Sequence, residues 1–248
     1  METIKRPYRY FRKRVRLYLK VNWLKSLYFN FKMLPWSKAR HLPVLFYGRV
    51  SLGNLSGSVH LPEVVKMGMI GFGQPYELVT NSRGVAELHL EGQITFRGYA
   101  QFGIDYFVHV GSEAHFEMGH MSSVASLGKV ICHQSITLGD YARIGSEAQL
   151  IDTNAHQMMD TQTGERFPVC GPIQLGSYNY ISNRVTLLQG AKTGDYCTIA
   201  SNTLCTKDYS DWGKNILIGG VPAQKLKEHI SRDWEGEQEL MERYLILY

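Results

Sequence analysis

The sequence predicts an all-β solenoid of the β-helix type, because it combines a six-residue repeat with one polar interruption of that repeat. Larger, mostly apolar residues recur at a step of six, at Leu138, Ile144, Leu150, Leu175, Ile181, Leu187, Thr193, Ile199 and Cys205. Smaller residues follow four places later, at Ala142, Ala148, Asn154, Asn179, Val185, Ala191, Cys197 and Thr203. A period of six fits neither the 3.6-residue helix nor simple strand alternation, so each hexad is read as a short strand plus a turn.

The residues before the regular hexads are predicted to form earlier coils of the same solenoid. Between residues 45 and 119, short β-rich pieces are separated by Gly, Ser and Asn turns. Extending the repeat backwards places inward positions at Cys132, Ser126, His120, Ala114 and Val108, with a second inward row at Ile136, Val130, Val124 and Met118. A solenoid needs several stacked coils before any of them is stable. We therefore predict one β-helix domain over residues 45–221.

A basic, aromatic-rich helical arm is predicted over residues 1–44. Residues 1–49 contain thirteen Lys or Arg and one Glu, a net charge of +12, whereas the rest of the chain carries −7. Apolar residues recur there at helical spacing, at Phe11, Val15, Tyr18 and Leu19. We expect this stripe to pack on the fold or on a neighbouring subunit, and peripheral contact with an anionic membrane is the alternative. No nucleic-acid-binding motif accompanies the charge, so no such partner is predicted.

Two further segments depart from the repeat. Residues 157–172, QMMDTQTGERFPVCGP, are polar and contain Gly and Pro, and an insertion of this kind must leave the wall of a solenoid as a projecting loop. Near the end of the chain, Leu240, Tyr244 and Leu247 stand at helical spacing. They predict a helical cap over residues 222–248 that covers the open end of the coil.

Composition limits the classes of protein that this chain can belong to. Its apolar runs are too short to cross a bilayer, and its N-terminus lacks the apolar core and cleavage site of a secretory signal. The four cysteines show neither the spacing of a zinc site nor the density of a disulfide scaffold, and Cys132, Cys197 and Cys205 fall on inward positions. We expect a cytoplasmic protein without a metal, at most peripheral to the inner face of the membrane.

Five short segments occur in a characteristic order between residues 136 and 227. They are DTNAH at 152–156, the projecting loop, YISN at 180–183, TKD at 206–208 and GGVPA at 219–223. Together they resemble the hexapeptide-repeat acyltransferases, in particular the O-acetyltransferases of sugars and bacterial surface polysaccharides. The resemblance implies a left-handed parallel β-helix with three flat faces and a homotrimer. It also implies acetyl-coenzyme A as acyl donor, held between two subunits, and a saccharide as acceptor.

The resemblance makes His156 the candidate catalytic base. A sugar hydroxyl is a poor nucleophile at neutral pH, and an imidazole with a pKa of about 6.5 can take its proton as it attacks a thioester. Asp152 and Asn154 match two acids of the family segment and are candidate substrate-binding residues. The second acid is an amide in this chain, so a hydrogen bond to substrate is expected there. Ordinary turn chemistry is the alternative for all three residues.

Candidate coenzyme-binding residues also follow from the resemblance. The matching positions are Asn183, Ser201, Thr206, Lys207 and Lys227. The two lysines suit phosphate groups as point charges, and Ser and Thr suit close approach along the pantetheine. The same residue types line many solenoid walls without such a role. The chain also departs from the family pattern at residues 180–182, where Trp-Ile-Gly is usual, at residues 200–203, and at Gln224.

Two other functions are compatible with the sequence. The first is a non-catalytic trimeric scaffold docked through the basic arm, which would not bind coenzyme A. The second is a zinc-dependent γ-type carbonic anhydrase, which needs three His with a closely spaced pair after a distant first one. His115 and His120 give such a pair, but His109 precedes them too closely and His133 and His156 follow them. This order makes the zinc enzyme the weaker alternative.

Overall fold

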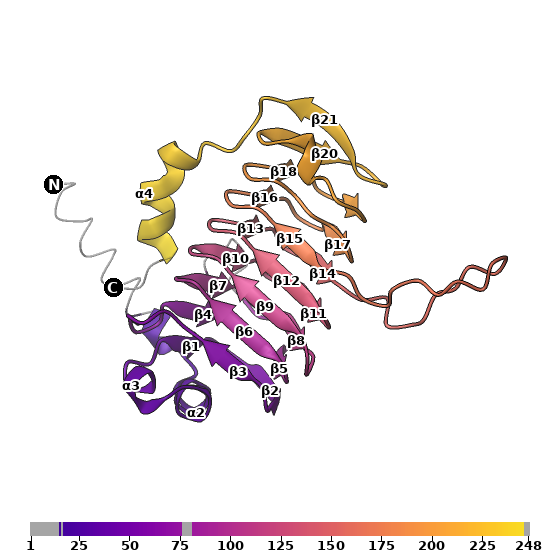
Figure 1. Ribbon diagram of the computed structural model, residues 1–248. Coiled ribbons are helices and arrows are strands. Elements are labelled where there is room, and N and C mark those ends of the chain that lie inside the picture. Colours follow the sequence, from indigo (N-terminus) through magenta and orange to yellow (C-terminus); the bar gives the residue numbers. More distant parts are fainter. Residues whose placement is uncertain (1–14, 16, 76–80, 246–248) are drawn as a thin grey trace.

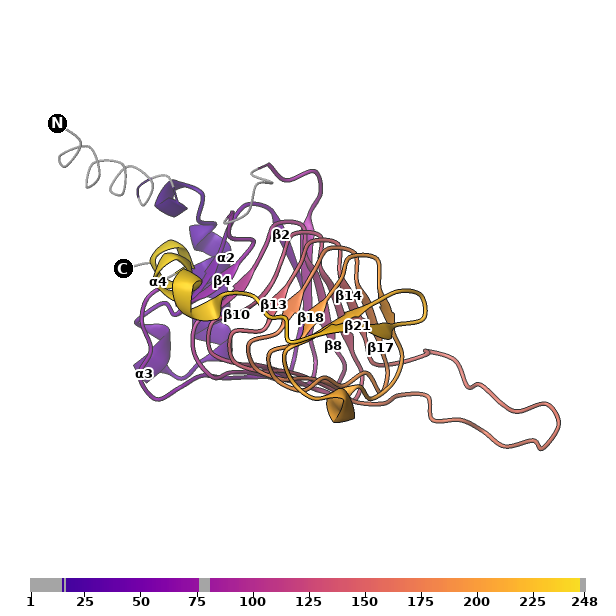
Figure 2. The ribbon, with the colours of Figure 1, turned by 90° about the horizontal axis from the view of Figure 1, so that it is seen from above.

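The chain winds into a left-handed parallel β-helix whose coils stack in Figure 1 and whose triangular cross-section is visible along the axis in Figure 2. The computed structural model describes residue 15 and residues 17–75 and 81–245. Among these residues, all pairs of named strands are parallel except the pair at the C-terminal end. The predicted fold class is therefore confirmed.

Each coil passes through three sheets in turn. The nine-stranded sheet contains, in stacking order, β1 (Val44–Phe46), β4 (Ile70–Phe72), β7 (Ala100–Phe102), β10 (Ser122–Val124), β13 (Arg143–Ile144), β16 (Tyr180–Ile181), β18 (Thr198–Ile199), β20 (Ile216–Gly219) and β21 (Gln224–Glu228). The seven-stranded sheet contains β2 (Val50–Leu55), β5 (Ala86–Leu90), β8 (Phe107–Val110), β11 (Lys129–Cys132), β14 (Gln149–Ile151), β17 (Thr186–Leu188) and β19 (Leu204–Cys205). The five-stranded sheet contains β3 (Ser58–His60), β6 (Gln93–Phe96), β9 (His115–Met118), β12 (Ser135–Leu138) and β15 (Ile173–Leu175).

The three corners between these sheets are named by what they carry. The loop corner lies between the seven-stranded and five-stranded sheets and holds residues 133–134, 152–172, 189–191 and 206–209. The second corner lies between the nine-stranded and seven-stranded sheets and holds residues 145–148, 182–185 and 200–203. The helix corner lies between the five-stranded and nine-stranded sheets and holds residues 139–142, 176–179 and 193–197.

The hexads fix the register of the regular coils. Ile181 pairs with Ile199 and Leu187 with Cys205, in each case three hexads apart, so equivalent residues stack in columns. The predicted inward positions are buried, with two exceptions, Asn154 and His120. His120 is only half-buried because it turns onto the rings of Tyr99 and Tyr141 at the helix corner.

The early coils are filled by aromatic rings rather than by small hexad residues. Phe46, Phe72 and Phe102 stack in a column through β1, β4 and β7, with ring centroids 5.1 and 4.3 Å apart. Tyr106 packs against the same column, 5.4 Å from Phe72. Rings of this size need a wider coil than Ile or Leu, which explains why the six-residue step is weak before residue 108.

Two short helices, α2 (Trp23–Met33) and α3 (Trp36–Ala39), cover the N-terminal end of the solenoid. The predicted helical stripe differs in detail from the structure, and its first residue, Phe11, lies outside the described residues. Val15 and Leu19 are exposed, whereas Leu17 and Val21 are the residues that pack on the fold. The buried face therefore lies two residues further along the chain than the stripe suggested.

The C-terminal segment also differs from the expected cap. After residue 221 the chain first forms β21, which pairs antiparallel with β20 and covers the last coil. The helix α4 (Trp234–Leu245) then runs back along the helix corner rather than across the open end (Figures 1 and 2). Within the residues described, neither α4 nor any other helix is long and apolar enough to cross a membrane.

Candidate active site

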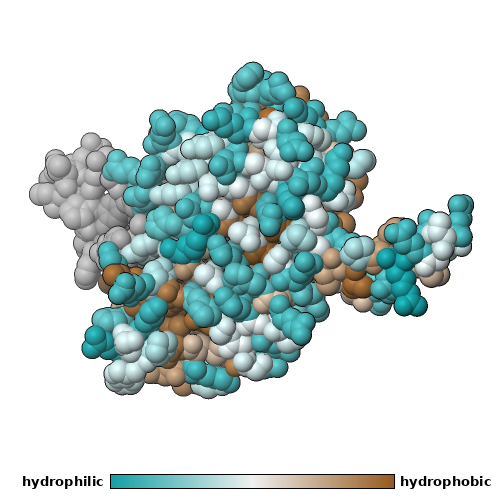
Figure 3. Space-filling model, viewed as in Figure 1, coloured by the Kyte–Doolittle hydropathy of each residue, from teal (hydrophilic) through white to brown (hydrophobic). Residues whose placement is uncertain are grey.

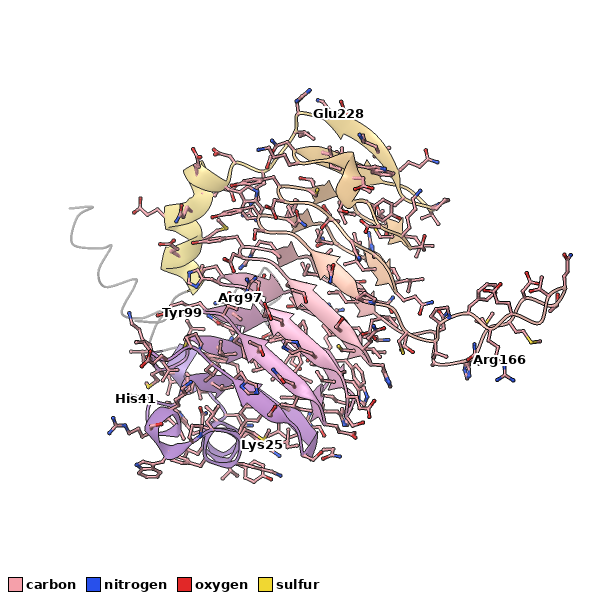
Figure 4. The ribbon with its side chains drawn as sticks, in the orientation of Figure 1. Lys25, His41, Arg97, Tyr99, Arg166 and Glu228 are labelled. Carbon is pink, nitrogen blue, oxygen red and sulfur yellow. The ribbon has the colours of Figure 1, made fainter. Side chains whose placement is uncertain are left out.

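A long loop leaves the loop corner between β14 and β15 and projects far from the body (Figure 2). It is a two-stranded arm, because Met159 and Arg166 pair antiparallel and the N–H of Phe167 donates to the C=O of Met158 at 3.0 Å. At its tip Asp160 accepts backbone hydrogen bonds, which hold the pKa of this carboxyl below its usual range. Figure 4 shows Arg166 well out on the arm. The loop predicted at residues 157–172 is therefore an ordered, hydrogen-bonded arm.

His156 lies at the base of this arm with its side chain exposed. The turn before it is fixed, because Ala155 has a φ of 58° and its N–H donates to Oγ1 of Thr153 at 2.9 Å. Across the base, the N–H of Asn154 donates to the C=O of Val169 at 2.8 Å. Within the described residues the imidazole of His156 has no hydrogen-bond partner. Its ring is therefore held at a defined place with both nitrogens open to a ligand.

Asp152 is fully buried, and both of its oxygens accept hydrogen bonds from the backbone of the coil below. Oδ1 accepts from the N–H of His133 at 2.7 Å, and Oδ2 accepts from the N–H of Gln134 at 2.8 Å. The same carboxylate adds to burial in raising the pKa of the Cys132 thiol. In this structure Asp152 fixes the turn below His156, and its predicted contact with substrate stays a prediction.

Asn154 departs from the hexad pattern because the wall ends one residue earlier. Thr153 pairs with Cys170 in an isolated antiparallel bridge, and this pairing closes the base of the arm. Asn154 is consequently exposed, unlike the small residues at the equivalent position of the other hexads. It lies two residues from His156, on the same exposed turn. A hydrogen bond from its amide to an acceptor bound there remains our prediction.

Thr206 and Lys207 lie on the loop corner two coils above His156, directly after β19. The N–H of Thr206 donates to the phenol oxygen of Tyr209 at 3.0 Å. The ammonium of Lys207 lies over the rings of Tyr209 and Trp212, at 5.8 and 5.6 Å from their centroids. Such cation–π contacts orient the ammonium and leave its charge available to an anion. Both residues are exposed.

The other three candidate coenzyme residues lie elsewhere. Asn183 and Ser201 are exposed at the second corner, and Oδ1 of Asn183 accepts a hydrogen bond from the N–H of Ser146 at 3.1 Å. Lys227 is exposed on β21, opposite Leu217. Within one chain the predicted site residues therefore divide between two corners and the last strand. A single copy does not bring His156 together with Asn183.

Three imidazoles line the outer face of the seven-stranded sheet near the loop corner. The ring of His109 lies 6.0 Å from that of His89 and 5.2 Å from that of His133. Burial, aided by the His133 charge, lowers the pKa of His109. His115 instead contacts Oγ1 of Thr95 at 3.0 Å. Across the part of the chain that the structure describes, no three His, Cys, Asp or Glu side chains form a group that could hold a metal ion.

Sequence reasoning missed a shallow cationic hollow beside Asn183. It is lined by Arg143 of β13, Tyr180 of β16 and Arg232, which precedes α4. The Arg232 guanidinium lies 5.4 Å from the Tyr180 ring and 4.9 Å from the Trp234 ring, and it pairs with Glu237. No local pattern signals this hollow, because Arg232 reaches it only through the path of α4.

Sequence reasoning also missed the tyrosine column beneath α4. Tyr141, Tyr178 and Tyr196 stack with centroids 5.1 and 4.8 Å apart, and Trp234 meets Tyr178 edge-on at 5.8 Å. The signal was present, because each tyrosine follows a Gly by two residues in successive coils. These residues have positive φ at the corner, which points their rings outward.

Comparison with known proteins shows no matching family model. Among solved structures, a hexapeptide-repeat acetyltransferase of Vibrio cholerae O1 biovar eltor in complex with acetyl-coenzyme A is 23% identical over 50% of this chain and 64% of that one, with a TM-score of 0.42. The polySia-specific acetyltransferase NeuO is 15% identical over 75% and 88%, with a TM-score of 0.49. The Bacillus cereus N-acyltransferase AntD, in complex with dTDP and 3-hydroxybutyryl-coenzyme A, is 13% identical over 80% and 87%, with a TM-score of 0.42.

This chain thus spans less than two thirds of the Vibrio cholerae protein. At these identities and TM-scores the likenesses support no statement about function. What the protein does is therefore inferred below from its own residues.

Proposed function

We propose that the protein is an acetyl-coenzyme A-dependent O-acetyltransferase that acts on a hydroxyl of a saccharide, with His156 as general base. The observation that carries the proposal is the state of His156, which is exposed, without a hydrogen-bond partner among the described residues, and held on a pinned turn. A base that must accept a proton from a bound hydroxyl needs such an open nitrogen on a rigid support.

The proposed reaction is a direct transfer. His156 takes the proton of the acceptor hydroxyl while its oxygen attacks the thioester carbonyl. The tetrahedral oxyanion then collapses, the C–S bond breaks, and the imidazolium returns its proton to the leaving thiolate. The products are an acetyl ester and free coenzyme A. Backbone N–H groups near the turn are the expected donors to the oxyanion, since a transition state of this kind is stabilised by fixed dipoles.

We further propose that the site is completed in a homotrimer. The support is the division of the candidate residues, because His156 and Lys207 lie on the loop corner whereas Asn183 lies on the second corner. The arm also carries exposed apolar side chains, Met158, Met159 and Phe167, that a neighbouring copy would cover. A loop corner of one copy set against the second corner of the next would bring both groups around one acyl donor.

The donor fits the cations available at these two corners. Lys207 is oriented by its aromatic neighbours, and Arg143 and Arg232 line the hollow next to Asn183. Coenzyme A carries a diphosphate and a 3′-phosphate, which both kinds of cation bind. Asp152, Asn154, Ser201, Thr206 and Lys227 keep their predicted binding roles within this proposal.

The proposal is tested by incubating the full-length protein with acetyl-coenzyme A and a panel of sugars and lipid-linked oligosaccharides while following release of free thiol. Thiol release that requires the acceptor, and that disappears when the acceptor hydroxyls are O-methylated, is the expected result. A thermal shift with coenzyme A separates the alternative of a non-catalytic scaffold. A protein that neither shifts with coenzyme A nor releases thiol with any acceptor would favour the scaffold.

A further inference from the structure

One face of α2 is apolar, exposed and free of acidic residues. Trp23, Leu27 and Phe31 follow each other at i, i+4 and i+8, and Leu24 and Tyr28 lie beside them. All five side chains are exposed, and Leu24 retains 78% of its surface. Two further exposed residues extend this surface, Leu19 before α2 and Trp36 of α3, whose ring lies 5.4 Å from Phe31. We call these seven residues the α2 face.

The opposite side of α2 is fixed to the solenoid and explains why the α2 face points outward. Oγ of Ser26 accepts a hydrogen bond from the N–H of Phe46 at 2.9 Å. The amide of Asn30 accepts from the N–H of Val44 at 3.2 Å and donates to its C=O at 2.7 Å. These bonds satisfy the free edge of β1, the first strand. The helix is thus held by its polar side, and its apolar side has no contact to make within the described chain.

Lysines border the α2 face. Lys25 and Lys32 lie on its edge, Lys20 precedes it, and the ammonium of Lys32 lies 5.6 Å from the Tyr28 ring. Lys25 is visible at this end of the molecule in Figure 4, and hydrophobic side chains gather at the same end in Figure 3. Between Glu2 and Glu63 the chain contains no acid and thirteen Lys or Arg. The whole N-terminal end therefore presents apolar rings and aliphatic chains inside a cationic border.

We propose that the α2 face docks the protein on an anionic lipid surface. Trp, Tyr, Leu and Phe inserted at headgroup level, with Lys at the border, is the composition of an interfacial helix. The charge selects the occupant, because anionic lipids complement an end of the molecule without acids. This inference is independent of the acetyl transfer proposed above. A second copy of the chain is the competing occupant, since the remainder of the chain carries −7.

The position of α2 gives the docked protein a defined orientation. Because α2 caps β1, the axis of the solenoid would stand on the membrane with the first coil lowest (Figure 1). His156 would then lie several coils above the surface, on a corner that faces sideways. In a trimer with parallel coils, three α2 faces would lie at the same end and act together. Such a protein would meet acceptors that are themselves anchored in the bilayer.

The test uses the full-length protein and sedimentation with vesicles of phosphatidylcholine, alone or with phosphatidylglycerol as about a third of the lipid. We expect binding to the anionic vesicles only, weakened by added salt. Leu24→Glu should weaken this binding about ten-fold, because it replaces an inserted apolar chain with a charge repelled by the lipid. The control is Leu226→Glu on β21, an exposed leucine at the opposite end, which should bind like the unaltered protein.

Two results would overturn the proposal. One is the absence of binding to anionic vesicles. The other is equal binding by the Leu24→Glu and Leu226→Glu variants, which would assign any attraction to the basic residues alone. Light scattering decides the competing occupant, because a Leu24→Glu variant with a smaller assembly mass and no lipid binding in the parent would identify a protein interface. Circular dichroism checks that both variants are folded.

Discussion

Oδ1 of Asp152 accepts a hydrogen bond of 2.7 Å from the backbone N–H of His133, one coil below. With the second bond to Gln134, it makes the buried carboxylate a clamp between two coils directly under the catalytic candidate. Asp152→Ala leaves two backbone donors without a partner. We expect it to lower the free energy of unfolding by about 2–4 kcal/mol, as measured by urea denaturation.

Asp160→Ala is the matched control for this prediction. Asp160 also accepts two backbone hydrogen bonds, from Gln162 and Thr163, but it does so at the exposed tip of the arm. Water replaces the lost acceptor there, so the unfolding midpoint should not move. Equal effects of the two substitutions would show that burial at the base of the arm is not what makes Asp152 important.

His156→Gln should remove acetyl transfer and leave the fold intact. The side chain is exposed and makes no hydrogen bond within the described residues, so stability should not change. Loss of a general base lowers kcat by about 10²- to 10⁴-fold. The measurement is thiol release at saturating acetyl-coenzyme A. His41→Gln, an exposed histidine at the N-terminal end, is the control, and a His156→Gln protein with full activity would refute the assignment of the base.

Gly139 at the helix corner is required for the spacing of the coils. A Cβ at this position would lie against the backbone N of Ser177 and 2.5 Å from the carbonyl carbon of Gly176. These atoms belong to the next coil and cannot move without opening the sheet. Gly139→Ala should therefore cost about 1–3 kcal/mol of stability.

Gly84→Ala provides the comparison for Gly139. A Cβ there meets no atom closer than Asp105 Cγ at 3.9 Å. The substitution should be neutral or slightly stabilising, because alanine restricts the unfolded chain. Thermal unfolding of the two variants side by side is the measurement. A Gly139→Ala protein as stable as Gly84→Ala would show that the coils can shift apart at little cost.

The regular part of the fold could be predicted from the sequence because the coil geometry itself has the period of the repeat. Ile181 and Ile199, three hexads apart, must stack if each hexad makes one side of a triangle. The loop was predictable for the same reason, since residues that do not fit the period have to leave the wall. The columns of Phe46 and Phe72 were not predictable, because wider coils have no fixed period.

The candidate site was predicted less completely, for two physical reasons. Asp152 has the same sequence neighbours whether its carboxylate faces a substrate or the N–H of His133, and only the path of the coil below decides between them. Contacts made by α4 were the second gap. Arg232 reaches Tyr180 and Trp234 because of the direction in which α4 returns, which local periodicity does not specify.

The contact between α4 and the helix corner should make stability depend on alkaline pH. The phenol of Tyr141 donates to Oε1 of Glu242 at 3.0 Å, and burial together with this hydrogen bond raises the pKa of Tyr141 from 10.0 to about 12. The folded protein therefore favours the neutral phenol more than the unfolded chain does. This stabilisation is fully present below pH 10 and is lost as the pH rises through the folded pKa of about 12.

Tyr141→Phe removes the ionisable group and keeps the ring on Tyr178. The difference in unfolding free energy between the parent and Tyr141→Phe should be constant between about pH 8 and 9 and should shrink as the pH rises from 10 to about 12. Urea denaturation at a series of pH values is the measurement, and taking the difference cancels the other buried tyrosines, Tyr47 and Tyr106, whose pKa values are also raised. Two curves that stay parallel through this range would mean that the Tyr141 phenol does not couple α4 to the solenoid.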